Sequence, residues 1–335
     1  MPTYFAIQST CRWLAGVGLG RSRCQYLRST VETIYFLPRS QQESSIQKFL
    51  IITADDFGLH EAVNEAVEQA SRAGVLTAAS LMVAAPAAAD AIRRARNLAN
   101  LRVGLHLVLA DGCAMLAPDL IPALADRAGY MNSRMFVNGM RFFAFPAVRR
   151  QLEAEIRAQF SAFARTGLTL DHVNMHKHFH LHPTLLQMLL RIGSDYGVSA
   201  VRVPQEPLWF AARNGAWFAG ANAALLAPWT ALMKRRLRAA RVLHNDRIFG
   251  VAASGTMDEA KLLTILARLP PGITEIYLHP AVQSGAAIAA SMSGYRHADE
   301  LAALLSPRVR AAIATGGFGR GGYADAMHAR KVPAA

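Results

Sequence analysis

From Phe49 onward, short apolar runs alternate with longer segments in which apolar residues recur every three or four positions. The short runs predict β-strands, and the periodic segments predict helices. The predicted strands are 50–54, 78–83, 102–109, 168–174, 200–203 and 273–278, and the predicted helices are 60–73, 87–98, 146–165, 183–196, 258–269 and 295–305. Strands separated by helices in one series favour a parallel sheet. We therefore predict an α/β fold with a single catalytic domain, built as a (β/α) barrel-like, distorted TIM-type structure.

The first 46 residues differ in composition from the rest of the chain. The charged residues that precede Glu32 are all arginines: Arg12, Arg21, Arg23 and Arg28. The apolar stretch 13–20 is short and rich in glycine, unlike the core of a signal peptide. We predict that 1–46 is an extension, either disordered or translated from a start codon assigned too far upstream. The catalytic domain is expected over 47–320, and 321–335 is expected to be a C-terminal tail.

One segment interrupts the alternation of strands and helices. The nineteen residues 215–233 carry no charge and include Trp217 and Trp229. Five basic residues follow at once: Lys234, Arg235, Arg236, Arg238 and Arg241. One interpretation is an interfacial amphipathic element with Trp anchors and a basic flank, and the other is a buried helical pair with a solvated basic edge. Under the first interpretation, the apolar and basic insertion 208–245 is expected to contact a membrane peripherally.

The charge balance narrows the class of partner. The 335 residues carry a formal net charge of +13, and 52% are hydrophobic but only 18% charged. A basic protein of this kind is expected to meet anions, either nucleic acid or an anionic membrane surface. The sequence has no RNA-binding signature, so the membrane is favoured and nucleic acid is not expected. Three cysteines without close spacing, Cys11, Cys24 and Cys113, indicate a reducing compartment without a disulfide framework.

Two adjacent carboxylates, Asp55 and Asp56, directly follow the first predicted strand. In α/β folds the carboxyl ends of the strands are where the chemistry takes place. Neighbouring side chains of a continuing strand point to opposite sides, so the two acids are expected to do different jobs. One could hold a metal and the other could act as a base.

Histidines supply the remaining candidates for a metal site. Five of the eleven histidines fall between positions 172 and 182, and alternate spacing on an extended strand would place them on one face: His172, His176, His178, His180 and His182. Histidines beside carboxylates are typical of a divalent metal site. His176, at the tip of its strand, is the expected ligand, whereas His178 and His180 would either orient substrate or support the metal ligands from the next layer of residues. His106 also lies late in a strand and is either a further ligand or a satisfied core residue.

Three other polar residues complete the predicted site. His279 follows the strand 273–278 and is either a general acid near neutral pH or a capping histidine at a turn. Arg202, inside the strand 200–203, either pairs with an active-site carboxylate or holds a substrate oxygen. Asn64, in the first predicted helix, joins His178, His180 and Arg202 in the predicted substrate-binding set.

Four motifs, in this order along the chain, resemble those of the YdjC-like carbohydrate deacetylases. They are Thr53-Ala54-Asp55-Asp56-Phe57-Gly58, Gly104-Leu105-His106-Leu107, His176-Lys177-His178-Phe179-His180 and Glu275-Ile276-Tyr277-Leu278-His279-Pro280. The resemblance extends from about Leu50 to Leu305. The run from His176 to Pro183, together with the later apolar insertion, is most similar to the branch associated with hopanoid biosynthesis, HpnK.

The resemblance implies a barrel-like fold and an enzyme that removes acetyl groups from N-acetylated sugars with one divalent metal, Mg or Zn. Carried over by motif, Asp56, His106 and His176 would be the metal ligands. Asp55 would be the catalytic base, and His279 the acid or an oxyanion partner.

The hopanoid branch implies a finer substrate, N-acetylglucosaminyl-hopanoid, whose deacetylation leaves a glucosaminyl-hopanoid. The chain departs from the family at one point, because Asn174-Met175 stands where the family often has Asp-Ser. The expected partners are this sugar or glycolipid, an inner-membrane surface met from the cytoplasm, and a second copy in a homodimer.

Other functions remain alternatives at this stage. The enzyme could deacetylate soluble chitooligosaccharides, or it could be a metal-dependent phosphoesterase, although such sites need more carboxylate ligands. A glycosidase, which needs two carboxylates about 5 to 9.5 Å apart, fits adjacent aspartates poorly. A non-catalytic, membrane-associated metal or lipid binder is the last alternative.

Overall fold

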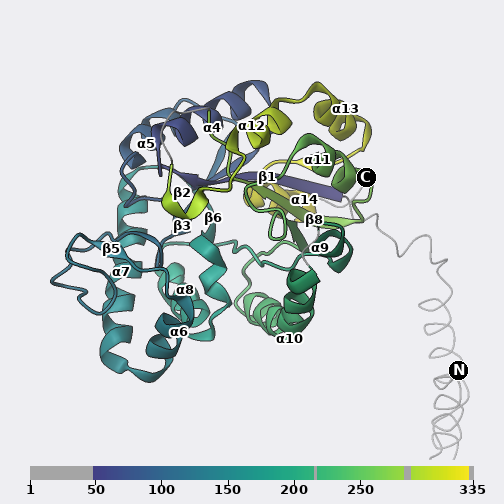
Figure 1. Cartoon of the computed structure of the whole chain (residues 1–335). Helices are drawn as coiled ribbons and strands as arrows, with labels where there is room; N and C mark the ends of the chain where they lie inside the picture. Colours follow the sequence, from purple (N-terminus) through teal and green to yellow (C-terminus); the bar gives the residue numbers. More distant parts are fainter. Residues whose placement is uncertain (1–47, 215–216, 283–287, 332–335) are drawn as a thin grey trace, which may run out of the picture. The chain divides into compact units, whose positions relative to one another are not determined.

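Seven parallel strands form the central sheet of the computed structural model, which describes residues 48–214, 217–282 and 288–331 (Figure 1). The strands are β1 (Lys48–Phe57), β2 (Ala78–Leu81), β3 (Arg102–Leu107), β6 (Leu170–Met175), β7 (Arg247–Phe249), β8 (Gly272–Leu278) and β9 (Gly319–Arg320). Their order is β6-β3-β2-β1-β8-β7, and β9 pairs with β1. All the carboxyl ends therefore meet at one edge, where Asp55, Asp56 and His106 lie.

A segment without regular strand geometry, 199–205, spans the gap between β6 and β7. The amide of Val173 in β6 donates to a carbonyl oxygen of this segment (3.0 Å), and the amide of Ile248 in β7 donates to the carbonyl oxygen of Gln205 (3.0 Å). Pro204 has no amide hydrogen, and the predicted strand here is reduced to isolated bridges. Hydrogen bonds thus continue around the sheet, and the predicted barrel-like α/β class is confirmed.

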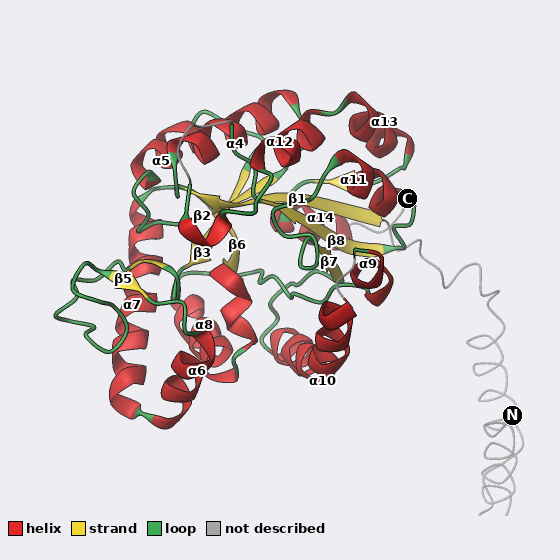
Figure 2. Cartoon of the chain, viewed as in Figure 1, coloured by secondary structure: helices red, strands yellow, loops and turns green. Residues whose placement is uncertain are grey.

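Helices surround this sheet, as Figure 2 shows. They are α4 (Glu61–Ala73), α5 (Ala88–Ala95), α6 (Met135–Ala144), α7 (Pro146–Arg165), α8 (Pro183–Asp195), α9 (Leu208–Arg213), α10 (Trp217–Ala239), α11 (Glu259–Leu266), α12 (His297–Leu305), α13 (Pro307–Thr315) and α14 (Tyr323–Lys331). Two short 3₁₀ helices, η1 (His176–Leu181) and η2 (Ala290–Met292), and a ribbon of β4 (Gly112–Cys113) and β5 (Tyr130–Met131) complete the described elements. All six predicted helices are present.

Local signals explain where several helices begin. His60 caps α4, because its Nδ1 accepts a hydrogen bond from the amide of Ala62 (3.0 Å). Pro146 and Pro183 stand at the first positions of α7 and α8, where a missing amide hydrogen costs nothing.

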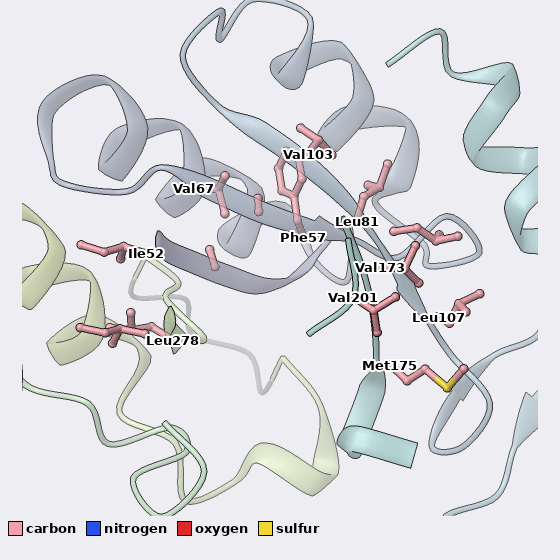
Figure 3. Packing of buried hydrophobic residues seen from close by; sticks show 14 of the residues in the cluster. Ile52, Phe57, Val67, Leu81, Val103, Leu107, Val173, Met175, Val201 and Leu278 are labelled. Atoms are coloured by element: carbon pink, nitrogen blue, oxygen red, sulfur yellow. The ribbon is translucent and has the colours of Figure 1, made fainter. Parts of the chain in front are cut away.

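The hydrophobic core fills the space between the sheet and the helices. Figure 3 shows part of it, including Ile52, Phe57, Leu81, Val103 and Leu107, all of which are buried. Every residue of β1 after Lys48 is buried, so this strand is covered on both faces, as expected for a parallel sheet.

Three predictions about organisation need correction. No helix or strand was predicted between 109 and 146, but this region contains α6 and the β4–β5 ribbon. The tail predicted at 321–335 contains α14, and its Tyr323 is fully buried. A helical pair was considered for the uncharged segment 215–233, but its described residues, 217–233, all belong to one 23-residue helix, α10.

The remaining organisational predictions concern the ends of the chain and the membrane. The predicted extension 1–46 lies outside the described residues. The described residues all belong to one compact unit. Among them, no helix combines the length and the apolar character that crossing a bilayer requires.

Candidate metal centre and active site

Asp56, His106 and His176 converge at the carboxyl edge of the sheet. One ligand atom from each can be chosen so that all lie within 4.8 Å of one another, and all three residues are buried. Asp56 Oδ1 lies 3.3 Å from His106 Nε2 and 3.2 Å from His176 Nδ1. This is the set that the motifs implied as metal ligands.

The chemistry of this group fits a divalent cation. Both carboxylate oxygens of Asp56 are buried, and neither accepts a hydrogen bond from the described residues. Burial by itself would raise the pKa of Asp56, but the neighbouring His176 and His106 hold it well below its usual value. A buried, ionised and otherwise unsatisfied carboxylate beside two imidazoles is a donor set that Zn²⁺ and similar ions accept.

The backbone at Asp56 explains how both aspartates reach one site. Asp56 adopts a left-handed conformation with φ of 60°, and the pairing of β1 with β2 shifts register between Ala54 and Phe57. This bulge interrupts the regular alternation of side chains. The expectation that the two acids point to opposite sides is therefore wrong for this strand end.

Asn174 orients His106 from the neighbouring strand. The side-chain oxygen of Asn174 lies 2.7 Å from His106 Nδ1, which leaves Nε2 facing Asp56. The Asn174 amide nitrogen donates to Ser80 Oγ (2.9 Å) and to Asp55 Oδ1 (3.2 Å). Such an outer contact fixes the tautomer and the ring orientation of a metal-binding histidine. The departure from the family at this position therefore keeps a polar group in contact with the site.

Gly104 in the second motif is explained by close packing. A Cβ at this position would lie 2.5 Å from the ring of His172, which itself is held between Asp171 and Ser80. Only glycine allows β3 to approach this ring, and β3 carries His106 two residues later.

Asp55 is fixed by a buried ion-pair network. Arg202 donates to it from Nη1 (2.5 Å) and Nη2 (2.9 Å), and contacts Glu275 through Nε (3.0 Å) and Nη2 (2.8 Å). Burial opposes ionisation, but Arg202 lowers the pKa of Asp55 well below its usual range. Glu275 also accepts hydrogen bonds from Thr53 (2.7 Å) and Tyr323 (2.6 Å). In its resting state Asp55 is thus an ionised carboxylate in a fixed orientation.

His279 faces the metal group from the end of β8. Its Nε2 lies 3.8 Å from Asp56 Oδ2, and burial lowers its pKa so that the neutral ring is favoured. Its backbone amide donates to Glu300 Oε2 (2.5 Å) on α12. Glu300 is buried, which raises its pKa to about 8.

A cavity of about 190 Å³, here called the reaction cavity, opens onto these groups. Asp55, His106, His176, His178 and His279 line it together with Tyr277, Tyr295, Lys177, Ser254, Ser291, Met175, Met292 and Val251. His178 Nε2 lies 3.1 Å from Tyr277 Oη. Asp55 and four histidines of the motifs therefore meet at one small cavity, and Asp56 lies next to two of these histidines, His106 and His176.

The histidine segment does not continue the strand, contrary to the sequence prediction. The strand ends at Met175, and η1 follows with left-handed Lys177 (φ 55°) and His178 (φ 54°). This turn directs His176 and His178 to the reaction cavity. His180 instead lies in the core, where its Nε2 contacts the carbonyl oxygen of Arg202 (2.8 Å).

Three residues predicted to bind substrate do not line the reaction cavity: Asn64, His180 and Arg202. The Asn64 amide contacts Gly58, Ala87 and Asp90, so its hydrogen-bonding groups already have partners. The guanidinium of Arg202 is fully buried behind Asp55. These three side chains contact other residues of the protein instead: Asn64 binds the amide of Gly58, His180 binds the carbonyl oxygen of Arg202, and Arg202 binds Asp55.

Sequence reasoning missed Glu275 and Glu300, which hold parts of the site in place. Glu275 interrupts an apolar strand, a signal that was recognised for Arg202 and could have been applied here. Glu300 lies on a helix 21 residues after His279, and nothing local in the sequence links the two.

Two carbohydrate deacetylases are similar to this chain in sequence. The chain is 37% identical over 155 residues to a carbohydrate deacetylase of Brevibacillus brevis, a match that covers 46% of this chain and 59% of that protein. It is 28% identical over 271 residues to a carbohydrate deacetylase of Geobacillus stearothermophilus, which covers 81% of this chain and 94% of that protein. The match thus spans about three fifths of the first relative but almost all of the second.

One solved structure shares the fold. A protein of Enterococcus faecalis V583, described as a candidate cellobiose-phosphate cleavage protein, superposes with a TM-score of 0.65 at 24% identity. The superposition covers 83% of this chain and 98% of that one. At the level of sequence, residues 49–315 match the family described as YdjC-like protein. The chain belongs to the YdjC-like protein family.

Proposed function

We propose that this protein is a metal-dependent hydrolase that removes the acetyl group from an N-acetylated sugar. The observation that carries the proposal is the buried Asp56–His106–His176 group, in which both Asp56 oxygens lack a hydrogen-bond partner among the described residues. A second, fixed carboxylate, Asp55, lines one cavity together with His106 and His176. The names of the related proteins, both carbohydrate deacetylases, support the same reaction.

In this mechanism Asp56, His106 and His176 would hold the metal. A divalent cation supplies two things there, a lowered pKa for a water ligand and stabilisation of negative charge on the acetyl carbonyl oxygen. Asp55, ionised and oriented by Arg202, takes the proton of the attacking water. The same proton can then pass from Asp55 to the amine nitrogen as the amide bond breaks, which yields acetate and a free amine.

His279 acts on the carbonyl side of this reaction. Because burial lowers its pKa, its resting form is a neutral imidazole, which offers one ring N–H at neutral pH. A neutral donor suits the developing oxyanion better than it suits protonation of the amine. We therefore favour the oxyanion role over the general-acid role for His279.

The finer substrate that we propose is an N-acetylglucosaminyl-hopanoid, which the enzyme would meet at the cytoplasmic face of the inner membrane. The sequence from His176 to Pro183 and the basic flank of α10 support this choice. Trp229 of α10 is 38% exposed, as an interfacial anchor would be, although its indole N–H also donates to Leu181. Peripheral contact through 208–245 is part of the same proposal.

Acetate release tests the reaction and the substrate together. The assay compares an N-acetylglucosaminyl-hopanoid with N,N′-diacetylchitobiose, each with and without a chelator. We expect chelator-sensitive release from the lipid. Release from chitobiose alone would retain the deacetylase and exclude the lipid substrate, and chelator-insensitive release would exclude the metal mechanism.

A further inference from the structure

A second cavity adjoins the reaction cavity and is larger, about 310 Å³ against about 190 Å³. We call it the apolar cavity. His176, Ser291 and Met292 line both cavities and form a shared wall. The apolar cavity therefore offers space, next to the reaction cavity, for a further group of a molecule that reacts at the metal centre.

The lining of the apolar cavity is mostly hydrocarbon, supplied by side chains such as Leu59, Met82, Val108 and Ile288. Two of its polar groups already have partners. His60 Nδ1 caps α4, and Tyr130 Oη donates to Asp111 (3.2 Å). A second sugar would have to bury several hydroxyl groups against this surface, which is costly without hydrogen bonds. An apolar group meets no such penalty.

An ion pair between Lys177 and Asp111 marks the boundary of the two cavities. Lys177 lines the reaction cavity, and Asp111 lines the apolar cavity. Both have left-handed backbones, with φ of 55° and 52°, which non-glycine residues seldom adopt. Conformations of this kind collect at ligand sites, where the surrounding structure holds them.

We propose that the apolar cavity binds the apolar aglycone of a glycoside whose N-acetylated sugar occupies the reaction cavity. The proposal rests on the deacetylase function argued above and adds a place for the aglycone. The Lys177–Asp111 pair would lie beside the glycosidic linkage and separate the polar from the apolar half of the substrate.

Two soluble glycosides test this subsite without a membrane, the methyl and the octyl β-glycosides of N-acetylglucosamine. Acetate release is measured with the full chain loaded with metal. We expect the octyl glycoside to have a KM at least about tenfold lower, equivalent to about 1.4 kcal/mol, with a similar kcat. Equal KM values for both glycosides would overturn the proposal.

A filling variant shows whether the gain comes from this cavity. Ala85→Phe places a ring in the apolar cavity, whereas Ala84→Phe, one residue earlier, is a matched control that lines neither cavity. Ala85→Phe should raise the KM of the octyl glycoside to that of the methyl glycoside and leave the methyl glycoside unchanged. Retention of the octyl preference in Ala85→Phe, or its loss in Ala84→Phe, would contradict the proposal. Absence of acetate from every glycoside would instead contradict the deacetylase function, and calorimetric binding of the octyl glycoside would then test the cavity alone.

A different observation, on the outer surface, carries a second inference. Phe136, Met140 and Phe143 recur at i, i+4 and i+7 on α6 and are exposed, Phe136 to 83% and Phe143 to 65%. Phe145 follows, also exposed. The opposite face of α6 packs through Phe142 onto Phe179 of η1, with ring centroids 5.5 Å apart. Exposed aromatic side chains gathered on one helix face mark an interaction surface.

The charge around this face indicates the kind of partner. Between Asp126 and Glu153 the chain has five arginines and no acidic residue: Arg127, Arg134, Arg141, Arg149 and Arg150. Two copies docked through α6 would bring these like charges together, which disfavours self-association. Anionic lipid headgroups complement them, and the aromatic side chains can enter the acyl boundary.

We infer that the exposed face of α6 docks on an anionic lipid surface. This inference concerns a different element from the insertion 208–245 and does not depend on the reaction. Figure 2 shows α6 at the periphery of the described unit, beside α7.

Co-sedimentation with vesicles tests the inference. The full chain is mixed with vesicles of phosphatidylcholine and phosphatidylglycerol, or of phosphatidylcholine alone. We expect binding to the anionic vesicles that weakens with salt, and a loss of at least about tenfold in binding for Phe136→Ser/Phe143→Ser. Leu120→Ser, an exposed apolar residue outside both α6 and the segment 208–245, is the matched control and should bind as the parent does. Undiminished binding by the double variant, or a dimer in solution that the double variant converts to a monomer, would overturn the inference.

Discussion

Asp55 and Asp56 are neighbours in the sequence, yet the structure surrounds them with different partners. Both oxygens of Asp55 are held by Arg202, whose guanidinium also binds Glu275. The oxygens of Asp56 face His106 and His176 and accept no hydrogen bond from the described residues. The carboxylate of Asp55 is thus fixed by hydrogen bonds, whereas the carboxylate of Asp56 keeps its lone pairs available.

The difference separates two requirements of a hydrolytic metal site. A base must stay ionised and aimed at one position, and a surrounding cation with fixed hydrogen bonds provides this. A ligand must keep its lone pairs available, and a buried carboxylate does so only when other donors are kept away. The bulge at Asp56 gives two adjacent aspartates different surroundings, and we propose that they have these two different roles.

The largest expected effect comes from Asp56→Asn, which breaks the ligand side. The variant loses the one negative charge among the three ligands, so divalent metal should be lost. Without several kcal/mol of metal stabilisation, acetate release should fall by roughly 10³-fold or more. Metal content is measured by mass spectrometry beside activity, and Asp195→Asn, an exposed carboxylate, is the control. Full metal content in Asp56→Asn would contradict the ligand assignment.

Asp55→Asn acts on the base side. The amide cannot accept the proton of the attacking water, so kcat should fall by about 10²–10⁴-fold. Metal content should remain at the level of the parent, because Asp55 is outside the group of three residues that could hold a metal. If the variant loses metal together with activity, the division of roles between the two aspartates is wrong.

Arg202→Met tests the fixed network by removing its only guanidinium. Asp55 and Glu275 would remain buried and ionisable without a cation, which destabilises a protein by roughly 3–5 kcal/mol. Urea unfolding measures the loss. Arg157→Met, at a half-exposed ion pair with Asp195, is the matched control and should change stability little. An equal effect of the two variants would show that the buried network is not distinct from a surface pair.

The sequence predicted much of this because the pattern is local. Strand ends can be read from apolar runs, and in parallel folds those ends meet, so Asp55, Asp56, His106 and His176 could be grouped without coordinates. The prediction failed where the chain leaves regular geometry. The left-handed turn at Lys177 and His178 cannot be read from residue types, so alternate spacing wrongly placed His180 with His176.

Long-range partners were also beyond sequence reasoning. Asn64 sits beside the first motif in the sequence, but its amide is satisfied by Gly58, Ala87 and Asp90. Tyr323 lies far along the chain, in what was taken for a tail, and binds Glu275 across 48 residues. Neither contact leaves a periodic or compositional signal.

A pH effect is expected from His180, which supports the fixed network through the carbonyl of Arg202. Burial lowers the pKa of His180 from 6.5 to about 4. Between these values the unfolded chain binds more protons than the folded one, so His180 contributes stability that is complete above pH 6.5 and lost as pH falls to 4. The loss amounts to about 3 kcal/mol. Urea unfolding at several pH values should show a steeper decline for the parent than for His180→Gln, and parallel curves would contradict the assignment.

The smallest effect is expected from Tyr323→Phe, at the far end of the fixed network. Its hydroxyl donates to Glu275 Oε2 (2.6 Å), and the ring packs on His172 with centroids 5.1 Å apart. The variant keeps the ring and loses the hydroxyl contacts with the charged Glu275 and with Asn245 Oδ1 (3.1 Å), so unfolding should become easier by about 1.5–3 kcal/mol, with metal content unchanged. If Asp55, Arg202, Glu275 and Tyr323 act as one unit, the loss should be smaller when Arg202→Met is already present. If the losses in the free energy of unfolding for Tyr323→Phe and Arg202→Met are strictly additive, Tyr323 is not coupled to Arg202. The network around Asp55 would then consist of Asp55, Arg202 and Glu275 only.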